Sequence, residues 1–157
     1  RALPNARLYG VDLSPFYIQK ARRTLAGIPG VGLLIENAEV LPFQNETFDG
    51  ATSTFLFHEL PRAVRRHVVQ EAARVLKPGG IFLVLDSAQL SESSGLGNFL
   101  TAFPELYHEP YFKSYLRDDL ALVAAECGFE VTATEPAFLS RIVVCRRPAP
   151  ADLDPQS

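Results

Sequence analysis

The 157-residue sequence predicts an α/β fold built on a mostly parallel sheet. Three observations predict it. Strand-like apolar runs alternate with amphipathic helical segments along most of the chain. The run Ile81–Asp86 is apolar almost throughout, which is typical of a strand covered on both faces. The runs 129–134 and 139–146 lie close enough in sequence to form a C-terminal antiparallel hairpin, with a turn at Pro136.

The first half of the chain contains three predicted strands and one helix. Residues 7–12, 31–35 and 48–55 are short apolar runs of strand length. A helix is expected between the first two, because Ser14 is a favourable N-cap and Pro15 suits the first helical position.

The second half contains two further helices. Apolar residues at helical spacing predict a helix over 62–76, and the Lys-Pro-Gly-Gly sequence at 77–80 should end it. Residues 117–127 form a second amphipathic pattern that stops at Gly128. The intervening segment is rich in Ser, Gly and Pro, with a short helix expected near 98–103.

Composition bounds the class of protein. Fifteen Lys and Arg against eighteen Asp and Glu give a net charge of −3, which argues against a nucleic-acid binder. Arg62, Arg65 and Arg66 are accordingly interpreted as a solvated helix face. No apolar stretch reaches the ~20 residues needed to cross a bilayer. Cys127 and Cys145 lack metal-site spacing and fit free thiols in a reducing cytoplasm.

The chain is long enough for one domain, which we expect over residues 1–147. Residues 148–157 are rich in Pro, Ala and Asp and are predicted to be a disordered tail.

Ligands of open α/β sheets bind beyond the carboxyl ends of the strands, which directs attention to the residues there. Asp12 ends the first predicted strand, where its carboxylate could accept from ribose hydroxyls or merely cap the next helix. Asn37, with the backbone of Ala38, could pair with an adenine edge or form an Asx turn. We expect Asp12, Asn37 and Thr54 to share one concavity.

Five motifs in order carry a resemblance to a known family. They are VDLS, NAEVLPFQNETFD, TFLFHEL, RVLKPGG before a strand, and a closing GF-strand-turn-strand. Together they resemble class I S-adenosylmethionine-dependent methyltransferases, in the small-molecule branch that includes the ubiquinone and menaquinone biosynthesis enzymes. The resemblance implies a Rossmann-like fold, S-adenosylmethionine as cofactor, and transfer of its methyl group to a small-molecule acceptor.

The resemblance also implies cofactor-binding residues at three strand ends: Asp12, Leu13, Asn37, Ala38, Thr54 and Phe55. Asp12 would hold the ribose hydroxyls and Leu13 would pack on the adenine. Most relatives have an acidic residue where Asn37 stands, but an amide oxygen can still accept from the adenine amine. The backbone at Thr54 and Phe55 would face the methionine part.

For catalysis the sequence offers His58 as a general base, because its ordinary pKa lies near neutrality. The alternative is that His58 only lines the pocket or caps the next helix. Tyr107 and Tyr111 belong to an aromatic-rich segment, 103–115, that either covers the substrate or packs on the sheet. No metal site is expected, since Arg62 stands where a His-Glu-x-x-His motif needs its second histidine.

The family pattern opens with a central strand and a Gly-rich loop, and only six residues precede the predicted strand 7–12. We therefore expect an N-terminally incomplete domain, with the first strand and the Gly-rich loop missing. Another chain could supply the missing strand, the strands ending at Asp12 and Phe55 could pair directly, or a homodimer could complete the sheet.

Two other functions compete with methyl transfer. A nicotinamide-dependent oxidoreductase also uses a carboxylate after its second strand, but it would not explain the NAEVLPF motif or the terminal hairpin. A non-catalytic binding or assembly module, or an inactive fragment, would be consistent with the absent Gly-rich loop.

Overall fold

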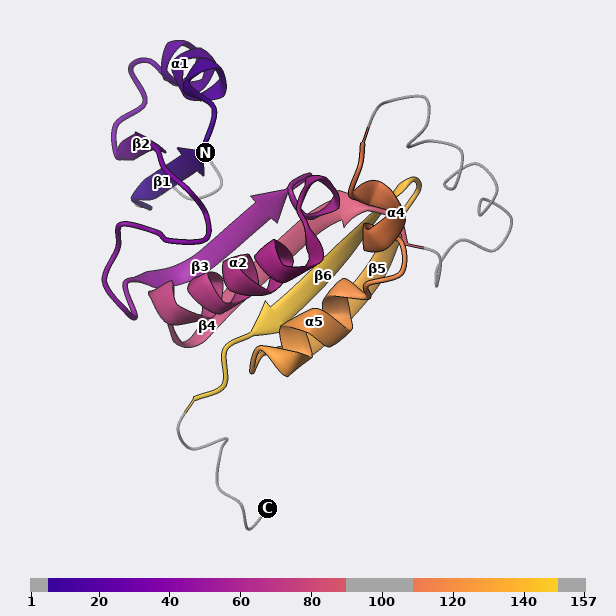
Figure 1. The fold of residues 1–157 in the computed structure, drawn as a ribbon. Helices are drawn as coiled ribbons and strands as arrows, with labels where there is room; N and C mark the ends of the chain where they lie inside the picture. The colour runs from indigo at the N-terminus through magenta and orange to yellow at the C-terminus, as the bar shows by residue number, and fades with distance from the viewer. Residues whose placement is uncertain (1–5, 90–108, 150–157) are drawn as a thin grey trace. The chain divides into compact units, whose positions relative to one another are not determined.

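The computed structural model describes residues 6–89 and 109–149, and the chain divides into two compact units, Arg1–Pro42 and Phe43–Ser157 (Figure 1). The first unit contains β1 (Leu8–Asp12), α1 (Pro15–Thr24) and β2 (Val31–Ile35). The second contains β3 (Phe48–Thr54), the 3₁₀ turn η1 (Phe57–Glu59), α2 (Arg62–Val75), β4 (Leu76–Ser87), α4 (Phe112–Tyr115), α5 (Leu120–Glu126), β5 (Glu130–Ala137) and β6 (Ser140–Arg146). Each unit is described by itself.

The first unit follows the sequence prediction closely. β1 and β2 pair in parallel, in a register that runs from Leu8 opposite Val31 to Asp12 opposite Ile35. Ser14 is the N-cap of α1, and its Oγ accepts from the backbone N–H of Tyr17 at 3.5 Å. These elements are specified by local signals, which is why the predicted bounds and the observed ones agree.

The second unit is a four-stranded mixed sheet in the order β3-β4-β6-β5. β3 and β4 are parallel, whereas β6 runs antiparallel to both β4 and β5. The predicted C-terminal hairpin is thus confirmed, although Pro136 lies within β5 opposite Arg141 and not in the turn. The turn is formed by Phe138 and Leu139, with Phe138 at φ +59°.

Helices cover one face of this sheet. Figure 1 shows α2 and α5 side by side on the same face. Beneath them the side chains of Phe82 and Val84 from β4 and of Val143 and Cys145 from β6 are buried. Alternate residues point to the other face, where Ile81 is 39% exposed. β4 is therefore fully covered on one face only within this unit, not on both as its apolar run indicated.

Two element boundaries differ from the prediction. β4 begins at Leu76, so the Lys-Pro-Gly-Gly segment belongs to the strand, where Gly79 has φ +80° and donates its N–H to the carbonyl of Arg147 at 2.8 Å. Glycine adopts this positive φ without strain, because it has no Cβ. α5 begins at Leu120 and not at residue 117, because Asp119 caps it by accepting from the N–H of Ala121.

Within the described residues, β1 and β3 are edge strands. β1 pairs only with β2, and β3 pairs only with β4. Direct pairing of the two flanking strands would join the two units, and it stays a prediction. The expected helix near 98–103 lies outside the described residues.

Among the described helices, none is long and apolar enough to cross a membrane.

Candidate functional site at the strand ends

The first group of predicted site residues is the β1–β2 cluster, which comprises Asp12, Leu13, Asn37 and Ala38. The register places Asp12 opposite Ile35, and the N–H of Glu36 donates to the carbonyl of Asp12 at 3.2 Å. Asp12 and Asn37 consequently lie close to each other at the carboxyl ends of the two neighbouring strands β1 and β2. Thr54 belongs to the second unit.

The carboxylate of Asp12 uses one oxygen locally. Its Oδ1 accepts from the N–H of Ser14 at 2.7 Å, which is the capping role considered from the sequence. A carboxylate has acceptor capacity on both oxygens. Oδ2 has no hydrogen-bond partner among the described residues, so Asp12 can cap the helix and still accept from a ligand hydroxyl.

Asn37 also forms a local turn. Its Oδ1 accepts from the N–H of Glu39 at 2.9 Å, and its Nδ2 donates to the Glu39 carboxylate at 3.3 Å. This is the Asx turn that was the alternative to adenine recognition. The amide oxygen keeps a second lone pair, and the N–H of Ala38 has no partner in the part of the chain that the structure describes.

Apolar side chains flank these polar groups. Leu13 is 70% exposed directly after Asp12, and Val40 is 73% exposed directly after the Asn37 turn. Exposed apolar residues beside unused acceptors and donors fit a flat heterocycle that carries hydroxyl groups. The residues present therefore fit the adenosine part of S-adenosylmethionine.

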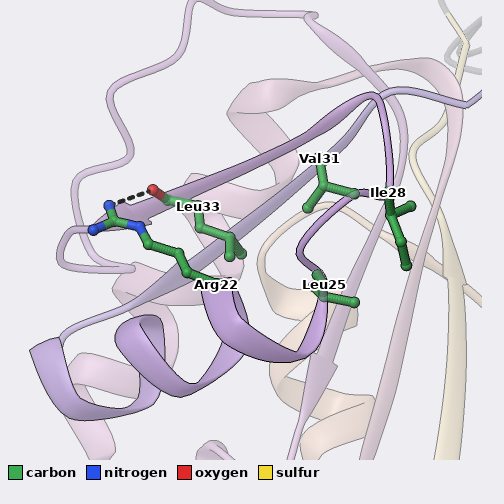
Figure 2. A pocket seen from close by; sticks show the side chains of 5 residues that line it. All are labelled: Arg22, Leu25, Ile28, Val31 and Leu33. Carbon is green, nitrogen blue, oxygen red and sulfur yellow. Dashed lines mark hydrogen bonds between the residues drawn. The ribbon is translucent and has the colours of Figure 1, made fainter.

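A hollow of about 170 Å³ in the first unit is a separate feature (Figure 2). It is lined by Arg22, Leu25, Ile28, Val31 and Leu33, and Arg22 donates to the carbonyl of Leu33 at 3.1 Å. Val31 is the first residue of β2, so the hollow lies toward the amino end of the strand, away from Asp12 and Asn37.

The second group is the β3–β4 cluster, which comprises Thr54, Phe55, His58 and Asp86. Phe55 follows β3 with φ +52°, a left-handed conformation that bulky residues rarely adopt. Leu56 next to it is right-handed, so the two residues form a concave backbone that can bind an anion. The N–H groups of Leu56 and Phe57 donate to Oδ2 of Asp86 at 3.1 and 2.7 Å.

Asp86 then holds His58. Its Oδ1 lies 2.6 Å from His58 Nδ1 and also accepts from the N–H of Ser87 at 2.8 Å. Burial of the ring works to lower the pKa of His58, but the hydrogen bond and charge of Asp86, aided by Glu109 and Glu59, raise that pKa above its ordinary value. His58 is thus a buried, oriented imidazole and not a solvated one.

Aromatic side chains surround His58. Phe55, Phe112 and Tyr115 each present a ring edge to it, with centroids 5.8–6.3 Å away. Phe112 and Tyr115 are buried, so part of the aromatic-rich segment does pack, whereas Tyr111 is 41% exposed and Phe55 46% exposed. Tyr107 lies outside the described residues.

Arg65 is the clearest correction to the sequence analysis. The expected solvated face holds for Arg62, whose side chain is 69% exposed, but Arg65 is fully buried. Its guanidinium donates to the carbonyls of Phe57 and Tyr111 and to the Asp118 carboxylate, at 3.0–3.2 Å. Burial lowers the pKa of Arg65 although Asp118 opposes that change. Arg65 thereby fastens η1 to the segment around α4.

The sequence places Asp86, like Asp12, at the end of an apolar strand, where ligand-binding residues are expected. It did not predict Asp86 as the partner of His58. The pairing itself joins residues 28 positions apart and depends on strand register. No cluster of three or more metal-ligating side chains occurs among the described residues.

Comparisons with known proteins agree with this architecture. A family model for "Methyltransferase domain" matches residues 1–80. The demethylmenaquinone methyltransferase of Symbiobacterium thermophilum is 35% identical over 89 residues, which are 55% of this chain and 35% of that protein. The ubiquinone/menaquinone biosynthesis C-methyltransferase UbiE of Desulfotalea psychrophila is 34% identical over 87 residues, or 55% of this chain and 34% of that protein. The chain thus spans about a third of the length of the curated relatives it matches.

Among solved structures, a SAM-dependent methyltransferase from Methanosarcina mazei has a TM-score of 0.69 at 18% identity, covering 90% of this chain and 82% of that chain. The fold is therefore that of the Rossmann-like methyltransferases, the class whose cofactor is S-adenosylmethionine. The chain belongs to the methyltransferase domain family, and its relatives lie in the ubiquinone and menaquinone branch. The resemblance found in the sequence motifs is confirmed.

Proposed function

We propose that this chain binds S-adenosylmethionine and serves the transfer of its methyl group to a small aromatic acceptor that carries a hydroxyl group. The proposal rests on the polar groups of the β1–β2 cluster in a chain that belongs to the methyltransferase domain family. Asp12 there combines a capping oxygen with a second oxygen that no described residue occupies. The acceptor class is supported by the names of two relatives, a demethylmenaquinone methyltransferase and a ubiquinone/menaquinone biosynthesis C-methyltransferase.

The β1–β2 cluster would bind the adenosine part of the cofactor. Oδ2 of Asp12 would accept from the ribose hydroxyls, and the exposed side chain of Leu13 would pack on the adenine. The second lone pair of the Asn37 oxygen would accept from the adenine amine, while the N–H of Ala38 donates to a ring nitrogen. Thr54 and Phe55 remain the proposed contacts of the methionine part.

When bound, the cofactor supplies a methyl carbon on a positively charged sulfur, which an acceptor displaces in line. The protein's contribution is alignment and exclusion of water. His58 is the proposed general base. Tyr111, which is 41% exposed whereas Phe112 and Tyr115 are buried, is the described candidate for contact with the acceptor.

Calorimetric titration of the chain with S-adenosylhomocysteine, the product form of the cofactor, tests the binding proposal. We expect saturable heat. Asp12→Asn should weaken binding about tenfold or more, because one charge-assisted hydrogen bond contributes ~1.5–3 kcal/mol. Its amide oxygen can still accept from the N–H of Ser14, so the cap survives.

Ser14→Ala is the matched control, because it removes the Oγ cap of α1 and leaves the Asp12 carboxylate in place. Its affinity should equal that of the unaltered chain. Equal affinity of Asp12→Asn and the unaltered chain would refute the ribose assignment.

The proposal also includes a partner and a cellular location. A second copy of the chain is the proposed partner at the free edge of β1 or β3, and sedimentation velocity would show a dimer. A reducing cytoplasm is the proposed location, supported by Cys127 and Cys145 being free thiols. Burial raises the pKa of Cys145 to about 11, so this thiol is unreactive near neutral pH.

A further inference from the structure

The β3–β4 cluster contains a hydrogen-bond arrangement that methyltransferase-family membership alone does not explain. Asp86 is fully buried, and it accepts from the backbone N–H groups of Leu56, Phe57 and Ser87 as well as from His58 Nδ1. Three fixed backbone donors leave the carboxylate in one orientation. That orientation aims Oδ1 at the imidazole.

The strained backbone at Phe55 serves this arrangement. Its φ of +52° turns the next two N–H groups toward Asp86, and its own N–H donates to the carbonyl of Leu85 at 2.8 Å. Strain of this kind persists where surrounding contacts fix it, and it is common at functional sites. The turn after β3 and the end of β4 are consequently joined into one rigid support for His58.

The proton on the imidazole is fixed by these contacts. A carboxylate only accepts hydrogen bonds, so Nδ1 of neutral His58 must carry the hydrogen that lies between it and Asp86. Nε2 is then unprotonated. Oε1 of Glu59 lies 3.9 Å from Nε2, which is beyond hydrogen-bond distance, and Nε2 forms no hydrogen bond within the described part of the chain, so it is available as a base.

We propose that Asp86 is a positioning residue that holds His58 in its Nδ1–H tautomer, so that Nε2 takes the hydroxyl proton of the methyl acceptor. This inference rests on the proposed function. The acceptor's O–H bond breaks, its electron pair stays on the acceptor, and the proton goes to Nε2. A ring carbon of the acceptor forms the new bond to the methyl carbon while the sulfur–methyl bond breaks, and the electron pair of that bond neutralises the sulfur. The hydrogen on the methylated ring carbon then leaves as a proton and the acceptor's oxygen takes one up, which restores the aromatic ring. His58 carries one positive charge until water removes its proton.

The electrostatic surroundings favour this proton transfer. The carboxylates near His58 come from three elements: Asp86 from β4, Glu59 from η1, and Glu109 from the residues before α4. From α4, Tyr115 faces the ring, and its hydroxyl donates to the carbonyl of Ser87 at 2.5 Å. Two buried arginines lie in the same region: Arg65, 5.5 Å from the centroid of the Tyr115 ring, and Arg141, which is opposite Asp86 in the β4–β6 register. Although burial opposes it, the three carboxylates raise the pKa of His58, so an imidazolium is stabilised.

The tautomer is tested directly by nitrogen NMR of the chain labelled with ¹⁵N-histidine. The chain has three histidines, and His58→Gln identifies the His58 signals by their loss. We expect, at alkaline pH where the ring is neutral, a protonated Nδ1 and an unprotonated Nε2. An Nε2–H tautomer, or the averaged signals of a free imidazole, would overturn the proposal. This readout does not depend on methyl transfer.

Asp86→Asn tests the positioning role. The asparagine side chain has an NH₂ donor in place of one carboxylate oxygen. In either orientation this donor would face another donor, either the N–H groups of Leu56 and Phe57 or Nδ1–H of His58. With labelled S-adenosylmethionine and a demethylmenaquinol (the reduced form, which carries the hydroxyl groups) as probes, kcat should fall at least tenfold, KM should change little, and the acid limb of the kcat/KM profile should move to lower pH. An unchanged profile would overturn the proposal.

Asp118→Asn is the matched control, because Asp118 is also buried but pairs with arginines and not with His58. It should keep the acid limb of the unaltered chain. If Asp86→Asn does not fold, the NMR result on the unaltered chain decides. If the unaltered chain neither binds S-adenosylhomocysteine nor transfers a methyl group, the proposed function is contradicted, whatever the tautomer of His58.

Discussion

Asp12 has separate tasks on its two carboxylate oxygens, and this division is the main result at the residue scale. Oδ1 caps the turn into α1, while Oδ2 has no hydrogen-bond partner among residues 6–89 and 109–149 and can accept from a ligand. From the sequence, capping and ribose binding were alternatives. The geometry makes them compatible, because each oxygen of a carboxylate accepts independently.

His58 makes stability depend on pH. Its pKa is raised in the folded chain, chiefly by Asp86 acting against burial. A raised pKa means that the folded state gains stability below the unfolded pKa of about 6.5, and that this gain is lost as pH rises through the folded pKa. Urea unfolding of His58→Gln and the unaltered chain should therefore differ more at pH 5.5 than at pH 8.5. A difference that does not vary with pH, or that grows with pH, would show that the Asp86 contact does not stabilise the imidazolium.

Arg65→Met should lower the free energy of unfolding by about 3–5 kcal/mol, because it removes one partner of the buried Arg65–Asp118 ion pair together with the hydrogen bonds to the carbonyls of Phe57 and Tyr111. Chemical denaturation measures this. The control is Arg62→Met, which removes a largely exposed arginine from the same Asp118 and should lower it by less than about 1 kcal/mol. Equal effects would mean that burial does not determine the contribution of each arginine.

At the scale of elements, the sequence predicted what local chemistry specifies. The β1–α1–β2 bounds follow from Ser14, Pro15 and two short apolar runs, and the structure reproduces them. The 3₁₀ turn η1 and the short helix α4 were not predicted, because contacts with Asp86 and Arg65 from distant parts of the chain hold them. Long-range pairing also explains why Arg65 was misinterpreted as solvated, since a helical pattern does not show what lies opposite.

The β5–β6 hairpin gives a prediction at this scale. Phe138 occupies the turn with φ +59° and a side chain that is 90% exposed, so its ring contributes little burial. A left-handed conformation costs a non-glycine residue about 1–2 kcal/mol, whereas glycine loses about 0.5–1 kcal/mol in chain entropy. Phe138→Gly should therefore stabilise the chain by about 0.5–1 kcal/mol in thermal or urea unfolding.

Glu135→Gly is the control for the hairpin, because Glu135 is exposed in the neighbouring strand with an ordinary φ. It should destabilise the chain by about 0.5–1 kcal/mol. If both glycine substitutions destabilise equally, the turn at Phe138 stores no backbone strain.

At the scale of the whole molecule, the buried core is distributed unequally. Of the buried hydrophobic residues in the described chain, Ile18 belongs to the first unit and the others to the second. Local opening is easier where few apolar contacts resist it. Amide hydrogen exchange should accordingly be faster in β1 and β2 than in β4 and β6. Equal protection in all four strands would mean that other contacts stabilise the first unit.

The central claim is that the β1–β2 cluster holds the adenosine of the cofactor, and an amide NMR titration with S-adenosylhomocysteine tests it most directly. The N–H of Ala38 is the best reporter, because a ring nitrogen would give it a hydrogen-bond partner that no described residue provides. We expect saturable shifts at Ala38, Leu13 and Asp12, with the Ala38 proton moving downfield. Shifts confined to the hollow lined by Arg22 and Leu33, with Ala38 unmoved, would contradict it.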